Sequence, residues 1–259
     1  MPRAKLFLLP GHIWHLTHRC HNRVFLLRFA RDRRAWVNWI YRAKIKYGLR
    51  VLAWAVTSNH IHLLVFADGR EDVIPRSILL AASRVALDYN RRKDRTGAFW
   101  EGSYHATAIE TGKHFRECLV YIDLNAVRAG IVDHPADWPF CGFQEIAGKR
   151  AWRRLIDKEL LVKFLGLKNP AQLASRCRDW IREALASGDL SRKPIWTENL
   201  AVGREDFIKR IQSELGLRAV YKEPVEDSGS YVLREPRSLY LPFDEKGPVL
   251  MQKKVEFDF

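Results

Sequence analysis

Residues 50–66 read RVLAWAVTSNHIHLLVF. Its two apolar runs, 50–56 and 60–66, are rich in the branched and aromatic side chains that favour β-strands. Thr57-Ser58-Asn59 lies between them and has the composition of a tight turn. The stretch therefore predicts an antiparallel β-hairpin.

Outward from this hairpin, the sequence periodicity alternates between strand and helix. Before it, residues 13–20 predict a strand and residues 31–47 a helix, in which apolar side chains recur at i, i+4, i+7 and i+11. After it, the patterns predict a helix at 72–93, a strand at 104–110 and a helix at 111–129. This order predicts an α+β fold of the ferredoxin-like βαββαβ type, an antiparallel sheet with one additional helix.

The remainder of the chain has a different pattern. Residues 146–222 are mainly helical in periodicity, with the clearest helices at 173–185 and 206–215. From 223 to 259, several prolines and glycines predict an irregular tail. We therefore expect three units, the first of which ends near residue 145.

Basic residues are concentrated near the start of the chain. The 259 residues carry 44 Lys and Arg against 30 Asp and Glu, a net charge of +14, and the apolar share of 47% argues against general disorder. Residues 1–50 hold twelve basic residues and one acid, Asp32, and so account for most of the excess. A localised positive field favours a polyanionic partner, usually nucleic acid. Solubility alone is the alternative use of this charge.

The cysteines and the apolar runs bear on the compartment. Cys20, Cys118, Cys141 and Cys177 lie far apart and form no C-x-x-C pair, which indicates reduced thiols rather than a zinc ribbon or a disulfide scaffold. The first residues lack the apolar run of a signal peptide. No run approaches the ~18 apolar residues of a membrane span. We expect a cytoplasmic protein with no membrane partner.

Two histidines occupy the second strand of the hairpin. Side chains alternate along a strand, so His60 and His62 share one face while Ile61 points to the other. Two imidazoles at i and i+2 can chelate one metal ion. The same pattern also arises as a pair of half-buried surface histidines, and this alternative stays open on the pattern alone.

Four further histidines recur every three residues, at His12, His15, His18 and His21. In a strand, positions 12 and 18 face one way and positions 15 and 21 the other, so they cannot converge on one ion without a bend. We interpret them as strand and DNA-groove residues. We expect His105, in the strand at 104–110, to border the candidate site.

A second pair of functional side chains lies in the helix at 111–129. Residues 119–130 read LVYIDLNAVRAG, in which Tyr121 and Asn125 are four residues apart and share a helix face. A tyrosine on an amphipathic helix is more often part of the core. The two pairs favour a single site when they are combined with the basic excess and the βαββαβ order.

An ordered set of motifs resembles a known protein family. The matching stretches are PGHIWH at 10–15, WAVTSNHIHLLV at 54–65, RTGAFWEGSYHA at 95–106, YIDLNAVRAGIV at 121–132 and ADWPF at 136–140. Over residues 1–145 the chain resembles the HUH-type single-tyrosine transposases, and among them the REP-associated tyrosine transposases. Where that family usually has Asn-Pro and Ser-Ser-Tyr, this chain has Asn125-Ala126 and Cys141-Gly142-Phe143.

The resemblance implies that residues 1–145 are the catalytic domain of a DNA transposase. Tyr121, on the additional helix, is then the catalytic nucleophile that cuts and rejoins single-stranded DNA through a covalent 5′-phosphotyrosine. His60 and His62 are then metal ligands, with Asn125 as a third, helix-borne ligand. The expected cofactor is a divalent metal, Mg²⁺ or Mn²⁺, and Mn²⁺ fits an imidazole pair better on ligand softness.

The expected partner is single-stranded or hairpin DNA of the REP-like kind. Basic side chains near the first strand and the two following helices would contact phosphates, and one aromatic side chain would stack on unpaired bases. Solvated faces and core packing are the alternatives for these residues. The candidates are Arg19, Arg23, Arg31, Arg33, Arg34, Arg84, Arg91, Arg92, Lys93, Arg95 and Trp100.

Two other functions stay open at the level of sequence. A non-catalytic, domesticated protein that binds DNA or RNA hairpins could have the same fold, although His60, His62 and Tyr121 together favour an enzyme. A metal-dependent hydrolase built on the histidine pair alone would lack the carboxylates that such sites usually contribute. A homodimer also stays open, because a site within one chain and a site between two chains share the same motifs.

Overall fold

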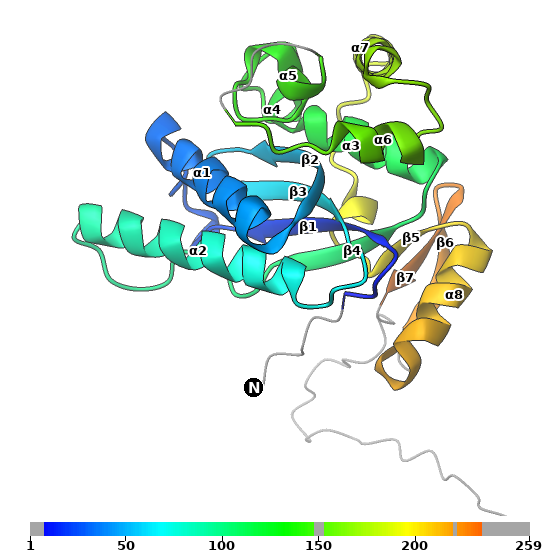
Figure 1. The fold of residues 1–259 in the computed structure, drawn as a ribbon, viewed down its shortest axis with the longest axis horizontal. Coiled ribbons are helices and arrows are strands. Elements are labelled where there is room, and N and C mark those ends of the chain that lie inside the picture. The colour runs from blue at the N-terminus through cyan, green and yellow to red at the C-terminus, as the bar shows by residue number, and fades with distance from the viewer. Residues whose placement is uncertain (1–7, 148–152, 220–221, 235–259) are drawn as a thin grey trace, which may run out of the picture.

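A seven-stranded sheet forms the centre of the protein, with strand order β2-β3-β1-β4-β5-β7-β6 among the described residues (Figure 1). The computed structural model describes residues 8–147, 153–219 and 222–234. The strands are β1 Ile13–Arg19, β2 Arg50–Val56, β3 His60–Phe66, β4 His105–Ile109, β5 Ala201–Gly203, β6 Glu223–Asp227 and β7 Ser230–Arg234.

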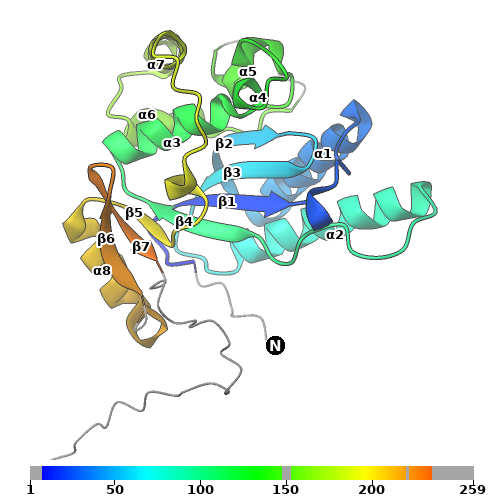
Figure 2. The same cartoon turned by 180° about the vertical axis from the view of Figure 1, so that it is seen from behind.

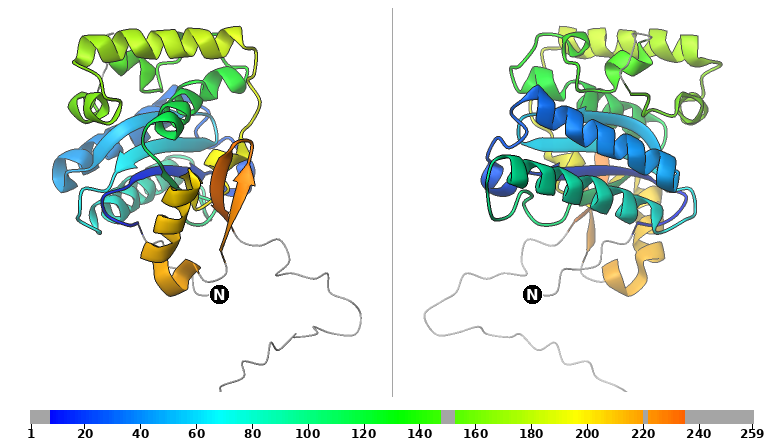
Figure 3. Two further views of the ribbon diagram at one scale, coloured as in Figure 1. Left: turned by 90° about the vertical axis from the view of Figure 1, so that its right-hand side faces the viewer. Right: turned by 60° about the vertical axis from the view of Figure 1, so that its left-hand side comes forward.

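Helices cover both faces of this sheet. The α-helices are α1 Ala30–Tyr47, α2 Val73–Arg92, α3 Lys113–Asp123, α4 Asn125–Arg128, α5 Phe143–Ile146, α6 Lys158–Phe164, α7 Pro170–Ala186 and α8 Glu205–Leu215. Helices α1 and α2 pack side by side on one face, and α3 crosses the other (Figures 1 and 2). Figure 3 shows α7 over α3, on the side away from the sheet.

The first four strands have the predicted ferredoxin-like arrangement. Strand β1 lies in the middle and pairs antiparallel with β3 and β4, and β2 pairs antiparallel with the far side of β3. The hairpin predicted at 50–66 is therefore confirmed, and so are the two helices before and after it. The α+β fold class follows from this order.

The register of the strands places the histidine pair. His62 lies opposite Thr17 of β1, and His60 lies opposite Arg19. Because directly opposite residues share a face, all four side chains project from the α3 side of the sheet. Ile61 is buried on the other side, under α1 and α2. Both faces of the sheet are therefore packed, and the histidine pair lies on the face that α3 covers with its buried Phe115 and Leu119.

The C-terminal part of the chain extends the same sheet, which corrects one expectation. Strand β5 pairs parallel with β4, and the hairpin of β6 and β7 continues outward from β5. The predicted irregular tail is wrong for residues 223–234, and residues 235–259 lie outside the described residues. The reason is positional: Pro224 stands on the outermost strand, and Ser228 and Gly229 both have positive φ in a two-residue turn. The predicted C-terminal helices at 173–185 and 206–215 are present in α7 and α8.

The helix predicted at 111–129 is divided in two. Helix α3 ends at Asp123 and α4 begins at Asn125, because Leu124 leaves the helical conformation with φ −79° and ψ 4°. All four cysteines are buried and unpaired, as expected for reduced thiols. No helix in the described part of the chain combines the length and apolar character needed to cross a membrane.

Candidate active site

The two histidines of β3 face α3 and meet the side chains of that helix. The ring centroids of His60 and His62 lie 5.0 Å apart, and both rings are largely or fully enclosed. They line a pocket of about 440 Å³ together with Tyr121 and Asn125. The structure thus brings together the four residues that the sequence singled out.

A chain of three hydrogen bonds fixes the tautomer of His62. The Nδ1 of His15 lies 2.9 Å from the carbonyl oxygen of Trp196, which can only accept, so that nitrogen carries the proton. The Nε2 of His15 is then an acceptor, and it lies 2.8 Å from His62 Nδ1, which must donate. The Nε2 of His62 therefore keeps its lone pair and accepts from the Asn125 amide nitrogen at 2.9 Å.

His60 is held in the same tautomer by different partners. Its Nδ1 lies 2.9 Å from Thr57 Oγ1 and 2.8 Å from Asn59 Oδ1. The Thr57 hydroxyl donates to the His60 carbonyl at 3.2 Å, so it accepts from the imidazole. With Nδ1 protonated, the lone pair of His60 is on Nε2. Both histidines of the pair therefore have an unprotonated Nε2, and in His62 that nitrogen accepts from Asn125.

Burial keeps these imidazoles neutral. Loss of hydration, with the nearby Arg19 and Arg128 acting in the same direction, lowers the pKa of His60 to about 4. Burial also lowers the pKa of His62 well below its ordinary value, with neighbouring His60 and His15 acting in the same direction. A neutral imidazole is the form that binds a metal ion.

The donor set fits a divalent cation. The Oδ1 of Asn125 is buried and has no hydrogen-bond partner among the described residues, an uncommon state for an amide oxygen. Two imidazole nitrogens and one amide oxygen are ligands that Mn²⁺ accepts, and Mg²⁺ uses the oxygen readily. The described residues contain no group of three or more His, Cys, Asp or Glu placed to hold a metal. A cation here would therefore complete its coordination with water or substrate oxygens.

Tyr121 stands over the histidines from α3. Its ring centroid lies 5.8 Å from that of His62 and 6.4 Å from that of His15, and its side chain is largely buried. The guanidinium carbon of Arg128 lies 3.7 Å from the centre of the phenol ring. Burial raises the pKa of Tyr121, and the positive charge of Arg128 opposes this rise. The site thus places a cation directly against the phenol.

Three of these residues were missed by sequence reasoning. His15 was interpreted as a strand and groove residue, yet its ring is fully buried in the hydrogen-bond chain. Register could have found it, because His15 and Thr17 share a face of β1 and Thr17 lies opposite His62. Arg128, seven residues after Tyr121, lies two helical turns away on the same side. No local pattern points to Trp196, which comes from a loop 181 residues beyond His15.

The predicted DNA contacts are spread over several surfaces. Arg19 lines the pocket itself, and the predicted border residue His105 does so too. Arg23 is exposed in the loop that follows β1. The others that are exposed lie on the helical layer formed by α1 and α2, away from the pocket. These are Arg31, Arg34, Arg84, Arg91 and Lys93.

Burial corrects the assignment of Arg33 as a DNA contact. Its Nη1 donates to the carbonyl oxygens of Leu27 at 2.9 Å and Arg28 at 2.7 Å. Its guanidinium carbon lies 4.7 Å from the ring centres of both Trp138 and Phe140. With 8% of its surface exposed, Arg33 holds the loop before α1 and cannot reach a phosphate.

Three other candidates are engaged within the fold. Arg92 forms an ion pair with the buried Asp32. Arg95 donates to the carbonyl oxygens of Gly97 and Ala98 and so closes the turn after α2. Trp100 donates from Nε1 to a backbone carbonyl of α2, and its ring stacks on His18 at 4.2 Å. Their assignment as DNA contacts stays a prediction.

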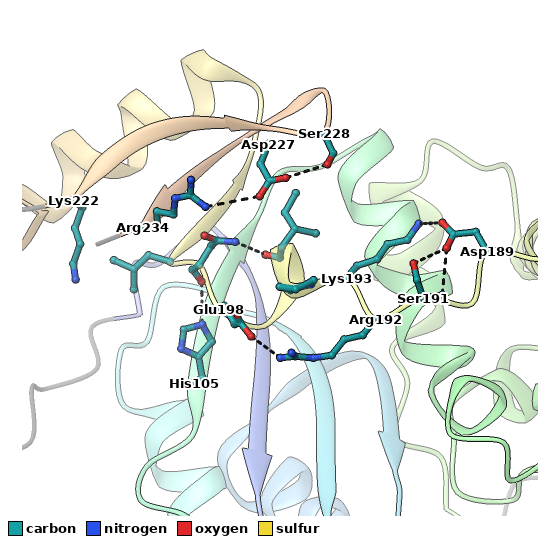
Figure 4. A pocket seen from close by; sticks show the side chains of 14 residues that line it. His105, Asp189, Ser191, Arg192, Lys193, Glu198, Lys222, Asp227, Ser228 and Arg234 are labelled. Carbon is teal, nitrogen blue, oxygen red and sulfur yellow. Dashed lines mark hydrogen bonds and ion pairs between the residues drawn. The ribbon is translucent and has the colours of Figure 1, made fainter. Parts of the chain in front are cut away.

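A larger cleft adjoins the pocket on its C-terminal side. It measures about 960 Å³ and lies between the loop 189–199 and the hairpin of β6 and β7. Ion pairs line it, with Arg192 2.6 Å from Glu198 and Lys193 3.0 Å from Asp189 (Figure 4). Arg192 and Glu198 border both hollows. Residues outside the predicted catalytic domain therefore form one wall of the site.

No protein-family model matches the chain, and no curated protein sequence matches it. Among solved structures, the chain is similar to a chain described as a candidate transposase from Deinococcus radiodurans R1. Identity is 18% and the TM-score 0.33, over 46% of this chain and 92% of that one.

A second similar structure is that of a REP-associated tyrosine transposase bound to a REP hairpin. Identity is 22% and the TM-score 0.45, over 56% of this chain and 84% of that one. The family that the sequence motifs resemble is thus represented among the solved structures to which this chain is similar.

Proposed function

We propose that this protein is a metal-dependent DNA transposase that cuts single-stranded DNA with Tyr121 and rejoins it, and that it recognises hairpin DNA. One observation carries the proposal. Tyr121 lines the same pocket as His60 and His62, and the hydrogen bonds around the two imidazoles leave a lone pair on each Nε2. All of these side chains lie together within one chain.

The proposed cut is a transesterification. The phenol oxygen of Tyr121 forms a bond to the phosphorus of a phosphodiester, and the bond from that phosphorus to the 3′ oxygen breaks. The phenol proton passes to solvent and the 3′ oxygen gains a proton, so the products are a 5′-phosphotyrosine and a 3′-hydroxyl. Attack by a 3′-hydroxyl on the phosphotyrosine reverses the step. Joining therefore needs no ATP, because the covalent link conserves the bond energy.

Arg128 supports the nucleophile in this proposal. A free tyrosine has a pKa of ~10 and is a weak nucleophile as the neutral phenol. Burial alone would make Tyr121 weaker still, since it raises the pKa of the phenol. The guanidinium of Arg128, 3.7 Å from the ring centre, stabilises the phenolate and partly offsets the cost of burial.

The chain offers three ligands to the cation. His60 Nε2, His62 Nε2 and Asn125 Oδ1 would hold a divalent metal, which would polarise the phosphoryl oxygens and neutralise their charge. In the described structure the His62 lone pair accepts from the Asn125 amide. Asn125 must therefore release that nitrogen when a metal binds, and its unpartnered Oδ1 is the atom that can turn toward the ion.

A covalent adduct tests the function directly. Incubation with end-labelled DNA that carries a hairpin and an unpaired flank, with Mn²⁺ or Mg²⁺, should give a band of protein linked to DNA on a denaturing gel. EDTA should remove the band, and mass spectrometry of the digested adduct should locate the nucleotide on Tyr121. Tight hairpin binding without an adduct under a broad range of conditions would instead favour the non-catalytic hairpin-binding protein.

His15 should control metal affinity without touching the metal. His15→Leu removes the acceptor that keeps the proton on His62 Nδ1, so the competing tautomer becomes accessible. We expect the affinity for Mn²⁺, measured by titration calorimetry, to fall by roughly 10–100-fold, the usual cost of losing such an outer partner. His15→Gln can still accept from His62 and should restore part of the affinity.

His18→Leu is the matched control for this experiment. His18 lies on the same strand and is similarly buried, but its ring stacks on Trp100 and bonds the backbone carbonyl of Gly102, and it forms no hydrogen bond with His62. Its loss should leave Mn²⁺ affinity unchanged. Equal losses from both substitutions would mean that the effect comes from general destabilisation of β1 and not from the tautomer of His62.

A further inference from the structure

An apolar surface that no other described residue covers lies shortly after β1. Val24, Phe25 and Phe29 expose 53%, 62% and 55% of their surface, whereas Leu26 and Leu27 between them are buried. Two phenylalanines exposed to water within five residues are unfavourable, and such an apolar patch often marks a binding surface. We call residues 23–29 the Phe loop.

The Phe loop is held in one conformation. Its backbone is tied to the fold by Leu27, whose N–H donates to the carbonyl of Ser58 at 2.8 Å, and by Arg23, whose carbonyl accepts from Asn59 Nδ2 at 3.0 Å. The buried Arg33 donates to two carbonyl oxygens at its far end. The two rings are therefore presented on a rigid support, which lowers the entropy cost of binding.

Positive charge lies beside Phe29 and elsewhere on the loop. The guanidinium carbon of Arg28 and the ammonium nitrogen of Lys93 each lie 5.8 Å from the centre of the Phe29 ring. Arg23 and Arg31 are also exposed on or beside the loop. The one acid of the first fifty residues, Asp32, is buried and already paired with Arg92. The surface thus combines flat apolar rings with cations that anionic side chains of the same segment do not neutralise.

The Phe loop adjoins the candidate active site through one side chain. The Nδ2 of Asn59 bonds the loop at Arg23, while its Oδ1 bonds the Nδ1 of His60. A DNA strand that lies across the Phe loop would therefore lead directly to the histidine pair, because Asn59 contacts both.

We infer that the Phe loop is a stacking platform for unpaired bases of a single DNA strand, with Phe25 and Phe29 against the bases and the adjoining cations against the phosphates. This inference rests on the proposed function for the nature of the strand. Base stacking on aromatic side chains and neutralisation of phosphates are the two components of single-strand binding, and both are present here. Exposed apolar side chains alone would also suit the binding of a second protein. The cations beside Phe29 favour a polyanion instead.

Binding of a labelled oligothymidylate in EDTA tests the platform apart from any cutting. Phe25→Ala with Phe29→Ala should weaken binding by about 30-fold or more, at ~1 kcal/mol or more for each stacked base. A 2-aminopurine base in the strand should be quenched by the wild type and not by the variant. Ile45→Ala with Leu79→Ala is the matched control, because these side chains are equally exposed on α1 and α2, and it should bind as the wild type does.

The salt dependence separates the two components. The alanine pair at Phe25 and Phe29 should leave the slope of log affinity against log salt unchanged, whereas Arg28→Gln with Lys93→Gln should reduce it. Unaltered strand affinity in the phenylalanine variant would overturn the inference. If the same variant instead abolished self-association seen by sedimentation, the loop would be an interface between copies.

Failure of the proposed function would look different. If the wild type formed no covalent adduct but bound the strand through Phe25 and Phe29, the proposed transposase activity would be wrong and the stacking platform would still be supported. If the adduct formed equally well in the wild type and in the variant without the two rings, the proposed activity would be supported and the stacking platform would be contradicted.

Discussion

Tyr121→Phe is expected to reduce formation of the covalent protein–DNA adduct to the background of the assay. The substitution removes the only atom that can bond to phosphorus at this position and keeps the ring that packs near His62 and Trp196. Removal of a covalent nucleophile costs on the order of 10⁶-fold in rate. Binding of Mn²⁺ and of the unpaired strand should stay within about twofold of the wild type, since the ligands and the surrounding basic side chains are unchanged.

Tyr104→Phe is the control for loss of a buried hydroxyl. Burial raises the pKa of Tyr104 to about 12, and its ring contacts His18 on the other side of the sheet from the histidine pair. The adduct should form normally in this variant. An adduct that persisted in Tyr121→Phe would move the nucleophile elsewhere and would contradict the assignment.

His60→Ala should abolish both metal binding and cutting while the protein still binds the unpaired strand. The substitution removes one of two imidazole lone pairs directed into the pocket, and one imidazole with an amide makes a weak site. The affinity for Mn²⁺ should fall by more than the roughly 10–100-fold expected for loss of an outer partner such as His15. Cutting should fall with it across the accessible range of metal concentration. The proposed strand binding would rely on cations and aromatic rings elsewhere, so it should change little.

Two comparisons make this result specific. His12→Ala removes a histidine that immediately precedes β1, where its Nε2 bonds Glu214, and should leave the affinity for Mn²⁺ as it was. His62→Ala should match His60→Ala in metal binding, although the buried ring also packs against its neighbours, so its unfolding should be measured in parallel. Equal loss of strand binding and cutting in His60→Ala would indicate a structural role for the histidine.

Much of the site could be read from local periodicity. Alternation along a strand puts His60 and His62 on one face, and a spacing of four puts Tyr121 and Asn125 on one side of a helix. Both relations depend only on residues a few positions apart, so they hold before any tertiary contact forms. The order of strands and helices, and with it the α+β architecture, follows from the same kind of pattern.

Other expectations were wrong because amino-acid composition does not show where a residue lies in the folded protein. Prolines and glycines from residue 223 onward suggested an irregular tail, yet Pro224 stands on an edge strand and Gly229 in a tight turn, where both residue types are favoured. Arg33 was one arginine among several in a basic segment, and only the packing of Trp138 and Phe140 around it shows that it is internal.

The hairpin at 50–66, the shared face of His60 and His62 and the shared face of Tyr121 and Asn125 follow from residues that are close together along the chain. How these side chains are held follows from contacts between distant segments. The proton on His62 is set by His15, which depends in turn on a carbonyl at Trp196 from the far end of the chain. Likewise, the exposure of Phe25 and Phe29 depends on what other segments leave uncovered. Hydrogen bonds and burial between distant segments follow from the packing of the whole fold. They cannot be predicted from the periodicity of neighbouring residues.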